Sequence, residues 1–303
     1  MPRDHLSGRK RCCPRRKKLW NSLAHRIISE RPGTAHVILA GGTAGRRKHV
    51  SGRWIYILLA VFLPVSGACL GDDAAAFAVA DASFFAMDYT AAITGYDVLL
   101  RSRPDDPQIL WRLARAHVCL AEVQDDAQRK AMCDAAEQYA RRCIQGDSLL
   151  AEGHTWRAAA LGYIALGEGA RRQAEISREI LVETDRALRI NPRDDAALSI
   201  RGSVFRALGN VSWMKRQLAA LLFGGVPSGG FEEGEAALKQ AIAIAPDVMR
   251  HSYELGVLYL DWGRQEDARR ALEQALLMPV RVAIDRPRQE KIKLFLTRLS
   301  AEQ

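Results

Sequence analysis

The chain has 303 residues and a formal net charge of +9, and hydrophobic residues make up 48% of it. Its length exceeds that of one typical globular domain, although a chain built from repeated units grows without enlarging a single core. The charge is uneven, because residues 1–53 hold 14 Lys and Arg against 2 Asp and Glu, whereas the remainder holds 30 against 33. The high isoelectric point therefore describes the N-terminal tail, and it gives no reason to expect a nucleic-acid-binding body.

Residues 1–53 form a basic tail that has no sustained apolar period, so we expect it to be disordered. It contains two dense basic runs, Arg9 to Arg11 and Arg15 to Lys18. Such runs bind nucleic acid or anionic lipid, but no interleaved aromatic residues favour nucleic acid here. A third interpretation is that residues 1–49 are not translated and that Val50 is a misread start codon. Sequencing the N-terminus of the native protein decides between these interpretations.

Residues 54–69 begin with ten uninterrupted apolar residues, and Pro64 then breaks the run. This run is short for a membrane span and is typical of a secretory signal. Ser66 and Ala68 are small residues at the spacing that signal peptidases cleave, and Cys69 follows as in lipoprotein signals. Ser66 departs from the lipoprotein pattern, which prefers Leu, Val or Ile at that position. Ordinary cleavage, lipidation of Cys69 and an uncleaved anchor all remain open, and each predicts an exported protein that is periplasmic or membrane-anchored.

The clearest helical pattern lies between Phe231 and Met278. Apolar residues recur there at helical spacing in three segments, which Pro246, Trp262-Gly263 and Pro279 end. The segment meets most of the tetratricopeptide pattern W-x2-L-G-x2-Y, A-x3-F, P. The matching residues are Leu255, Gly256, Tyr259, Ala268, Leu272, Ala275 and Pro279. Gly256 and Ala268 are small, which lets the two helices of a hairpin approach closely, while Tyr259 and Leu272 fill the space beside them.

The same register extends towards the N-terminus, where Pro104, Pro192 and Pro246 each end a helix. Small residues recur at the equivalent helical position, namely Cys143, Ala187, Ala241 and Ala275. Aspartates follow each of the three prolines and are expected to cap the next helix, namely Asp105 and Asp106, Asp194 and Asp195, and Asp247. Residues 74–300 are therefore predicted to be all-α, a tetratricopeptide-like solenoid of about five helical hairpins.

A long insertion separates Gly209 from Phe231, where a plain repeat needs a short turn. Its sequence predicts a lengthened or additional short helix, followed by a flexible glycine-rich loop. We interpret Trp213 and Leu221-Leu222 as core residues packed at the end of the hairpin. The alternative interpretation is that they form a lip that binds a partner.

No pattern in the chain indicates a catalytic or metal site. Cys119, Cys133 and Cys143 lack C-x-x-C spacing and a neighbouring histidine cluster, so a metal site is not supported. We interpret Cys143 as a core residue, and one disulfide among the three remains open if the protein is exported. His117 and His154 lie on predicted helices without an orienting third group, which favours structural roles. The sequence therefore predicts a protein that is not an enzyme and has no cofactor.

Three stretches resemble the regulator of microtubule dynamics family of tetratricopeptide proteins and its bacterial relatives. They are Trp111 to Ala116, Ala187 to Pro192, and Ser212 to Gly224 within the insertion. The resemblance covers residues 74–300 and implies a helical-repeat adaptor without catalytic residues. It also implies links to microtubules and to mitochondrial or reticular membranes. An exported protein would meet no microtubules, so the predicted export signal conflicts with the microtubule role.

The first helices of successive hairpins line the concave face of such a solenoid, and their exposed residues select the ligand. These helices are predicted near residues 108–118, 154–163, 198–207 and 250–260. The candidate partner-binding residues are Arg112, Arg115, Arg157, Arg201, Arg206, Tyr253 and Asp261. The arginines suit an acidic peptide or a carboxylate terminus, but they are equally suited to ion pairs with neighbouring Asp and Glu. The functions left open are a protein-binding scaffold, a lipid-anchored component of an envelope assembly machinery and a microtubule-associated adaptor.

Overall fold

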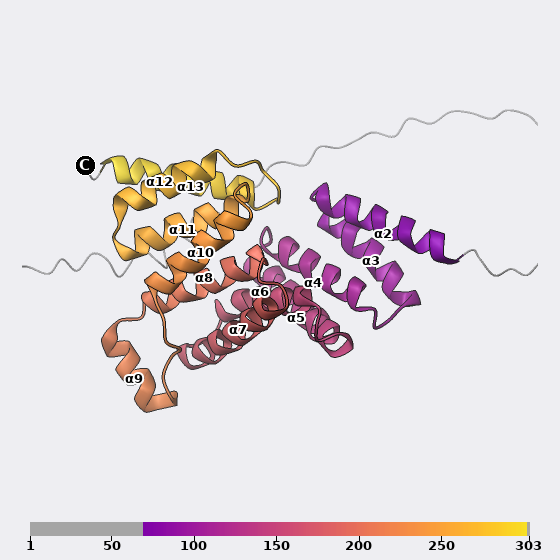
Figure 1. Cartoon of the computed structure of the whole chain (residues 1–303), viewed down its shortest axis with the longest axis horizontal. Helices are drawn as coiled ribbons and strands as arrows, with labels where there is room; N and C mark the ends of the chain where they lie inside the picture. Colours follow the sequence, from indigo (N-terminus) through magenta and orange to yellow (C-terminus); the bar gives the residue numbers. More distant parts are fainter. Residues whose placement is uncertain (1–68, 302–303) are drawn as a thin grey trace, which may run out of the picture. The chain divides into compact units, whose positions relative to one another are not determined.

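The computed structural model describes residues 69–301, and this part of the chain consists of α-helices without a β-strand. Five hairpins follow one another along the chain (Figure 1), and their helices are α2 (Cys69–Phe85) with α3 (Tyr89–Ser102), α4 (Pro107–Ala121) with α5 (Asp126–Gly146), α6 (Ala151–Ala165) with α7 (Ala170–Ile190), α8 (Asp195–Gly209) with α10 (Phe231–Ile244), and α11 (Met249–Trp262) with α12 (Gln265–Leu276). Helix α9 (Trp213–Phe223) lies between α8 and α10 in the sequence, and α13 (Asp285–Ala301) follows the last hairpin. The all-α fold and the five predicted hairpins are confirmed.

Aspartate side chains begin several of these helices. Asp106 Oδ1 accepts a hydrogen bond from the backbone N–H of Gln108 at 2.8 Å, and Asp194 Oδ1 accepts one from Ala197 at 2.9 Å. Each bond satisfies an N–H group that has no partner within its helix, and both caps were predicted. The predicted cap at Asp247 is wrong. Val248 occupies the N-cap of α11, so the Asp247 carboxylate lies one residue too early and pairs with Arg281 instead.

The last two hairpins are closed by contacts between a glycine on the first helix and a leucine on the second. A Cβ atom added at Gly256 would lie 2.6 Å from Cγ of Leu272, and one added at Gly202 would lie 2.5 Å from Cγ of Leu238. The small positions predicted from the repeat, Cys143, Ala187, Ala241 and Ala275, are all fully buried. The predicted register of the repeat is therefore confirmed at the positions where the helices lie closest together.

The interpretation of the insertion as core is wrong. Helix α9 forms as expected and ends at Gly224, whose φ of +77° suits a residue without a side chain. Its large apolar side chains, however, mostly point outward: Trp213 is 73% exposed and Leu221 is 84% exposed. The end of the α8–α10 hairpin is already filled, because the Phe231 ring packs directly over Gly209.

The C-terminal segment folds back onto the N-terminal hairpin, a contact that the repeat pattern did not predict. The backbone N–H of Ala283 donates to the Tyr89 hydroxyl at 3.0 Å, and Ala283 packs against the apolar cluster around Tyr89. Glu122, at the end of α4, also pairs with Arg250 on α11 and Arg288 on α13. These contacts hold the first two hairpins against the last part of the described chain.

The tail and the signal-like run lie outside the described residues. Helix α2 begins at Cys69, but nothing is described of the side chains of residues 69–73. Among the described helices, none is both long and apolar enough to cross a membrane. Cleavage before Cys69, its lipidation and the use of the run as an anchor stay predictions.

Candidate partner-binding face

Helices α4, α6, α8 and α11 are the first helices of the last four hairpins, and each packs against the next. We call the surface formed by their exposed and half-buried side chains the first-helix face. It carries the predicted partner-binding residues, namely Arg112 and Arg115 on α4, Arg157 on α6, Arg201 and Arg206 on α8, and Tyr253 and Asp261 on α11. The structure distributes the arginines among separate ion clusters, so they do not converge on one point.

Arg157 lies at the centre of the most acidic cluster. Its Nη1 atom lies 2.7 Å from Glu183 Oε1, its Nε atom 3.1 Å from Glu137 Oε1, and its Nη2 atom 3.4 Å from Glu179 Oε2. Glu183 is also hydrogen-bonded to Nδ1 of buried His154 at 2.5 Å. Burial alone would raise the pKa of Glu183, but the hydrogen bond to His154 and the charge of Arg157 outweigh it and lower that pKa. Arg157 is thus committed to the packing of α5, α6 and α7.

Arg206 links α8 to α11. Its Nη1 atom lies 2.8 Å from Asp261 Oδ2, and its Nε atom lies 3.8 Å from Glu254 Oε2. Tyr253 lies beside this cluster, and burial, reinforced by the charge of Glu254, raises its pKa to about 12. Arg201, one turn earlier on α8, pairs with Asp185 of α7. Both arginines therefore have carboxylate partners within the chain.

A third cluster joins distant parts of the chain, and nothing in the sequence predicted it. The buried Glu122 carboxylate accepts hydrogen bonds from the Tyr163 hydroxyl at 2.5 Å and from Arg288 at 3.4 Å, and it also pairs with Arg250. Burial raises the pKa of Tyr163 well above its usual value, and the charge of Glu122 acts in the same direction. Arg250 and Arg288 follow Glu122 by 128 and 166 residues. No local pattern in the sequence marks groups so far apart as partners.

The Arg112–Arg115 pair on α4 differs from these clusters because Asp81 is the one carboxylate paired with its two guanidinium groups among the described residues. In the Glu122 cluster, by contrast, Arg288 also pairs with Asp285. Asp81 Oδ1 lies 3.3 Å from Arg112 Nε and 3.6 Å from Arg115 Nη2. The Tyr96 hydroxyl also donates to Asp81. The buried Nε atom of Arg115 has no hydrogen-bond partner among the described residues. Positive charge therefore exceeds negative charge within this cluster of Arg112, Arg115 and Asp81.

Aromatic rings hold both guanidinium groups of the pair in place. The Arg112 guanidinium lies 4.3 Å from the centre of the Trp111 ring, and that of Arg115 lies 3.8 Å from the centre of the Phe84 ring. Stacking on aromatic faces stabilises a guanidinium group and leaves its edge available to acceptors. The side chains of Arg112 and Arg115 are 20% and 14% exposed. Part of each side chain can therefore be reached from solvent, although Arg115 Nε is buried and Arg112 Nη1 already donates to Gln108.

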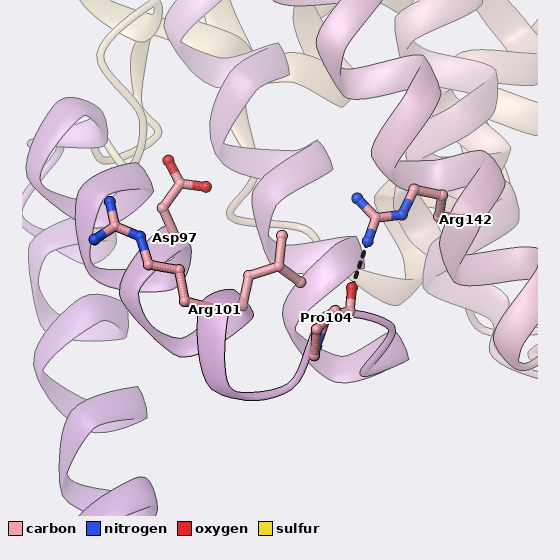
Figure 2. A pocket seen from close by; sticks show the side chains of 5 residues that line it. Asp97, Arg101, Pro104 and Arg142 are labelled. Carbon is pink, nitrogen blue, oxygen red and sulfur yellow. Dashed lines mark hydrogen bonds between the residues drawn. The ribbon is translucent and has the colours of Figure 1, made fainter.

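A shallow hollow of about 360 Å³ lies elsewhere, where α3 ends near α5 (Figure 2). It is lined by Asp97, Leu100, Arg101, Pro104 and Arg142, none of which was predicted to bind a partner. Arg142 donates a hydrogen bond to the Pro104 carbonyl at the rim, as the dashed line in Figure 2 shows. The lining residues include no nucleophile beside a base. The hollow therefore does not suggest a catalytic site.

The three described cysteines are buried and form no disulfide with one another. Burial raises the pKa of Cys119 and Cys143 to about 12 and that of Cys133 to about 11, so their thiols stay protonated and unreactive. His117 is buried and hydrogen-bonded to the Leu113 carbonyl at 2.9 Å. Across the described residues, no group of three His, Cys, Asp or Glu is placed to hold a metal ion. These cysteines and His117 pack and stabilise the helices.

A family model described as "Regulator of microtubule dynamics protein 1-3" matches residues 77–300. The chain belongs to the regulator of microtubule dynamics family. It is 24% identical to human regulator of microtubule dynamics protein 2 over 197 residues, which is 64% of this chain and 48% of that protein. It is also 24% identical to mouse regulator of microtubule dynamics protein 1 over 208 residues, covering 67% of this chain and 68% of that protein.

The chain spans about half the length of the first of these family members. A thermophilic tetratricopeptide protein of Thermus thermophilus has a similar structure, with a TM-score of 0.56 at 22% identity. This likeness covers 73% of the chain and 99% of that protein, and it shows the shared fold alone. The family resemblance and the tetratricopeptide-like fold are therefore both confirmed.

Proposed function

We propose that this family member is a non-enzymatic protein-interaction scaffold and that the Arg112–Arg115 pair is its docking point for an acidic segment of a partner. The observation that carries the proposal is the sharing of the single Asp81 carboxylate by two guanidinium groups. Arg157, by contrast, is surrounded by three glutamates. An incoming carboxylate therefore gains more at Arg112 and Arg115 than elsewhere among the predicted arginines.

The chemistry of docking follows from the geometry of the pair. Guanidinium groups bind carboxylates through paired, charge-assisted hydrogen bonds, and stacked rings reduce the conformational freedom lost on binding. The unpartnered Nε–H of Arg115 is one donor that a partner carboxylate would satisfy, after a small movement of the side chain. The Phe85 ring, 69% exposed on the neighbouring α2, offers an apolar contact for the residue beside that carboxylate.

The test compares variants of the full-length chain for binding to a fluorescein-labelled hexaglutamate peptide. Arg112→Gln with Arg115→Gln should weaken binding about tenfold or more, which corresponds to a loss of about 1.4 kcal/mol. Asp81→Asn should strengthen binding, because it removes the internal competitor for both guanidinium groups. The basic tail contributes equally to every variant, so the differences report the pair alone.

Arg171→Gln with Arg172→Gln is the matched control. It removes two arginines from the exposed surface of α7, where their partners are Glu175 and Glu179. Equal weakening in the control and the test variant would show that only net charge matters. Unchanged or weaker binding by Asp81→Asn would also contradict the proposal. A melting temperature measured for each variant separates loss of binding from loss of folding.

We further propose that residues 54–69 attach the scaffold to a membrane after export. The supporting observation is the uncharged apolar run followed by small residues and Cys69. A phosphatase reporter fused after residue 80 should be active outside the cytoplasm and inactive when residues 54–63 are deleted. Fractionation of Cys69→Ala distinguishes a lipid-anchored component of an envelope assembly machinery from a freely periplasmic scaffold. An inactive reporter on the intact chain would favour the microtubule-associated adaptor that the family name suggests.

A further inference from the structure

Helix α9 presents an almost continuous apolar surface to solvent. Five of its large side chains are mostly exposed: Trp213 (73%), Met214 (74%), Leu218 (55%), Leu221 (84%) and Leu222 (67%). With 3.6 residues per turn these side chains cover roughly half the circumference of the helix, interrupted by Gln217. We call these five residues the α9 stripe. Helices on the surface of a soluble domain usually turn such a stripe towards the core.

The opposite side of α9 is held by a charged residue. Arg216 donates to the backbone carbonyls of Leu208 at 2.6 Å, Gly229 at 3.0 Å, and Val211 and Pro227 at 3.3 Å. Its guanidinium group thus joins the end of α8 to the loop that follows α9. The side of the helix that carries Arg216 and Ala219 faces the protein, while the large apolar side chains face away. Figure 1 shows α9 standing apart from the paired helices.

A second arginine fixes the far end of the insertion. Arg178 of α7 donates to the carbonyls of Gly224 and Gly225, directly after the helix ends. Both ends of α9 are therefore tied to the body by bonds from side chains to backbone. This arrangement holds the apolar side of α9 towards solvent. Burying that side therefore requires an apolar environment outside the chain.

We propose that the α9 stripe inserts into the surface of an anionic lipid bilayer, with the helix lying in the plane of the membrane. Short helices with Trp and Leu on one side bind bilayers in this way, and basic neighbours strengthen binding to anionic lipid. Lys215 flanks the stripe and is exposed. No Asp or Glu occurs between Asp195 and Glu232, so the insertion itself brings no negative charge to the headgroups. At 11 residues, α9 is too short to span the membrane.

A second copy of the chain fits the stripe less well. Aromatic side chains bury about 150–250 Å² each, and the four other side chains of the stripe are smaller than Trp213, so at the observed exposures the five offer roughly 600 Å². A stable interface needs about 800 Å² from each partner. A bilayer sets no such minimum and needs no complementary shape, which suits a single protruding helix. The α9 stripe shares no residue with the Arg112–Arg115 pair. A negative result for membrane binding would therefore leave the proposed docking of an acidic segment untouched, and the reverse also holds.

The test uses the full-length protein with vesicles of phosphatidylglycerol and phosphatidylcholine whose acyl chains carry bromine. Bromine quenches tryptophan fluorescence only at close range, and five other tryptophans provide a constant background. The N-terminal residues can also bring the protein to vesicles, so the readout is the quenching that disappears in Trp213→Phe. We expect the parent to be quenched measurably more than Trp213→Phe by the mixed vesicles. We expect this difference between the two proteins to be smaller with vesicles of pure phosphatidylcholine.

A triple variant, Leu218→Gln, Leu221→Gln and Leu222→Gln, keeps Trp213 and removes most of the stripe. It should fold normally, because all three side chains are exposed, and it should lose the quenching assigned to Trp213. Equal total quenching of the parent and Trp213→Phe would overturn the proposal, as would unchanged quenching in the triple variant. A second copy of the chain would be the occupant if two results were found together. The parent would sediment as a dimer and the triple variant as a monomer, and lipid bromine would not quench Trp213 in the parent.

Discussion

The α11–α12 hairpin and helix α9 both contain many apolar residues but use them in opposite ways. In the hairpin, Leu258, Ala268 and Leu272 are completely buried. In α9, Leu221 and Trp213 are largely exposed. The hairpin residues recur at repeat spacing, so each apolar position has a matching surface on the next helix. The apolar character of a side chain indicates only that it is more stable away from water. The repeat pattern also predicts which helix of the chain will cover it.

The two regions also differ in how polar groups hold them. The repeat is held by apolar contacts and by ion clusters on the first-helix face, such as the one around Arg157. The insertion is held by Arg216 and Arg178, whose guanidinium groups bind backbone carbonyls. We therefore expect substitutions in the repeat to change the stability of the whole described domain. Substitutions in the insertion should change mainly its local order and its contacts outside the chain.

The largest effect is expected from Arg157→Glu, which places a fourth carboxylate among Glu137, Glu179 and Glu183. Removing one partner of a buried ion pair costs about 3–5 kcal/mol, because the remaining charge is left buried and uncompensated. The side chains of Glu183 and Glu137 are only 3% and 9% exposed, so water cannot replace Arg157. We expect the free energy of unfolding, measured with urea, to fall by that amount or the protein to fail to fold.

The control for Arg157 is Arg171→Glu, on the outer surface of α7. Its side chain is 76% exposed and pairs only with Glu175, so the change should alter stability by about 0.5 kcal/mol or less. Similar losses for the two variants would mean that the cluster around Arg157 adds nothing beyond an exposed pair. Charge reversal at Arg157 is consequently a poor test of partner binding, because it disturbs the fold first.

The next effect separates two glycines that both lie within helices. Gly256→Ala should cost about 1–3 kcal/mol, because its Cβ would lie 2.6 Å from Cγ of buried Leu272. Gly162→Ala on α6 should instead stabilise the protein by about 0.5–1 kcal/mol, since nothing lies within 4 Å of its Cβ and Ala favours a helix. Thermal unfolding of both variants checks the prediction. A Gly256→Ala protein that melts like the parent would mean that Leu272 moves aside freely.

The fold was predictable from the sequence wherever one repeat could be compared with another. Gly256, Leu272 and Pro279 match the tetratricopeptide pattern, and the same spacing located the earlier hairpins. Capping was predictable for Asp106 and Asp194, because each precedes its helix by one residue. It failed at Asp247, where one additional residue separates the carboxylate from the helix. The helices could thus be predicted from local sequence patterns. A shift of one residue was nevertheless enough to change the partner of the Asp247 side chain.

The candidate site was predictable only in part. The repeat register correctly placed the arginines on the first helices, because the face that a helical residue occupies follows from its spacing. It could not show that Arg112 and Arg115 share Asp81, since Asp81 lies on α2, outside the predicted register. It also could not show that Glu122 meets Arg250 and Arg288, because that contact depends on how the successive hairpins turn. The outward orientation of α9 depends on the bonds of Arg216, which no periodic pattern records.

A third prediction concerns Arg216→Gln in the insertion. The shorter, neutral side chain cannot reach four carbonyls, so we expect α9 and the following loop to loosen. The global free energy of unfolding should fall by only about 1.5–3 kcal/mol, since a hydrogen bond to a charged group contributes on that scale. Hydrogen exchange should speed up in residues 211–229 and stay unchanged in α11 and α12. Faster exchange throughout the repeat would show that the insertion and the hairpins unfold together.

A fourth prediction uses the pH dependence of stability. Burial lowers the pKa of His117 from its usual 6.5. As the pH falls, the unfolded chain therefore protonates this residue first, while the folded protein still keeps it neutral. The unfolded state then binds more protons, and the free energy of unfolding must fall as the pH drops below about 6.5. The contribution is at most about 1.4 kcal/mol per pH unit. His117→Gln should make the decline between pH 7 and pH 5 shallower, and an unchanged slope would contradict this.

The smallest effect on stability is expected from Leu221→Ser with Leu222→Ser in the α9 stripe. Both side chains are mostly exposed, and substitutions at such positions change stability by about 0.5 kcal/mol or less. Leu258→Ala on α11 provides the contrast, because this side chain is completely buried and its loss should cost about 2–5 kcal/mol. Urea unfolding of the parent and both variants without lipid measures the difference.

If the serine variant were destabilised as much as Leu258→Ala, the stripe would be packed against the chain in solution. A near-zero change would instead show that Leu221 and Leu222 contribute nothing to the isolated fold, which leaves an environment outside the chain to account for their apolar character.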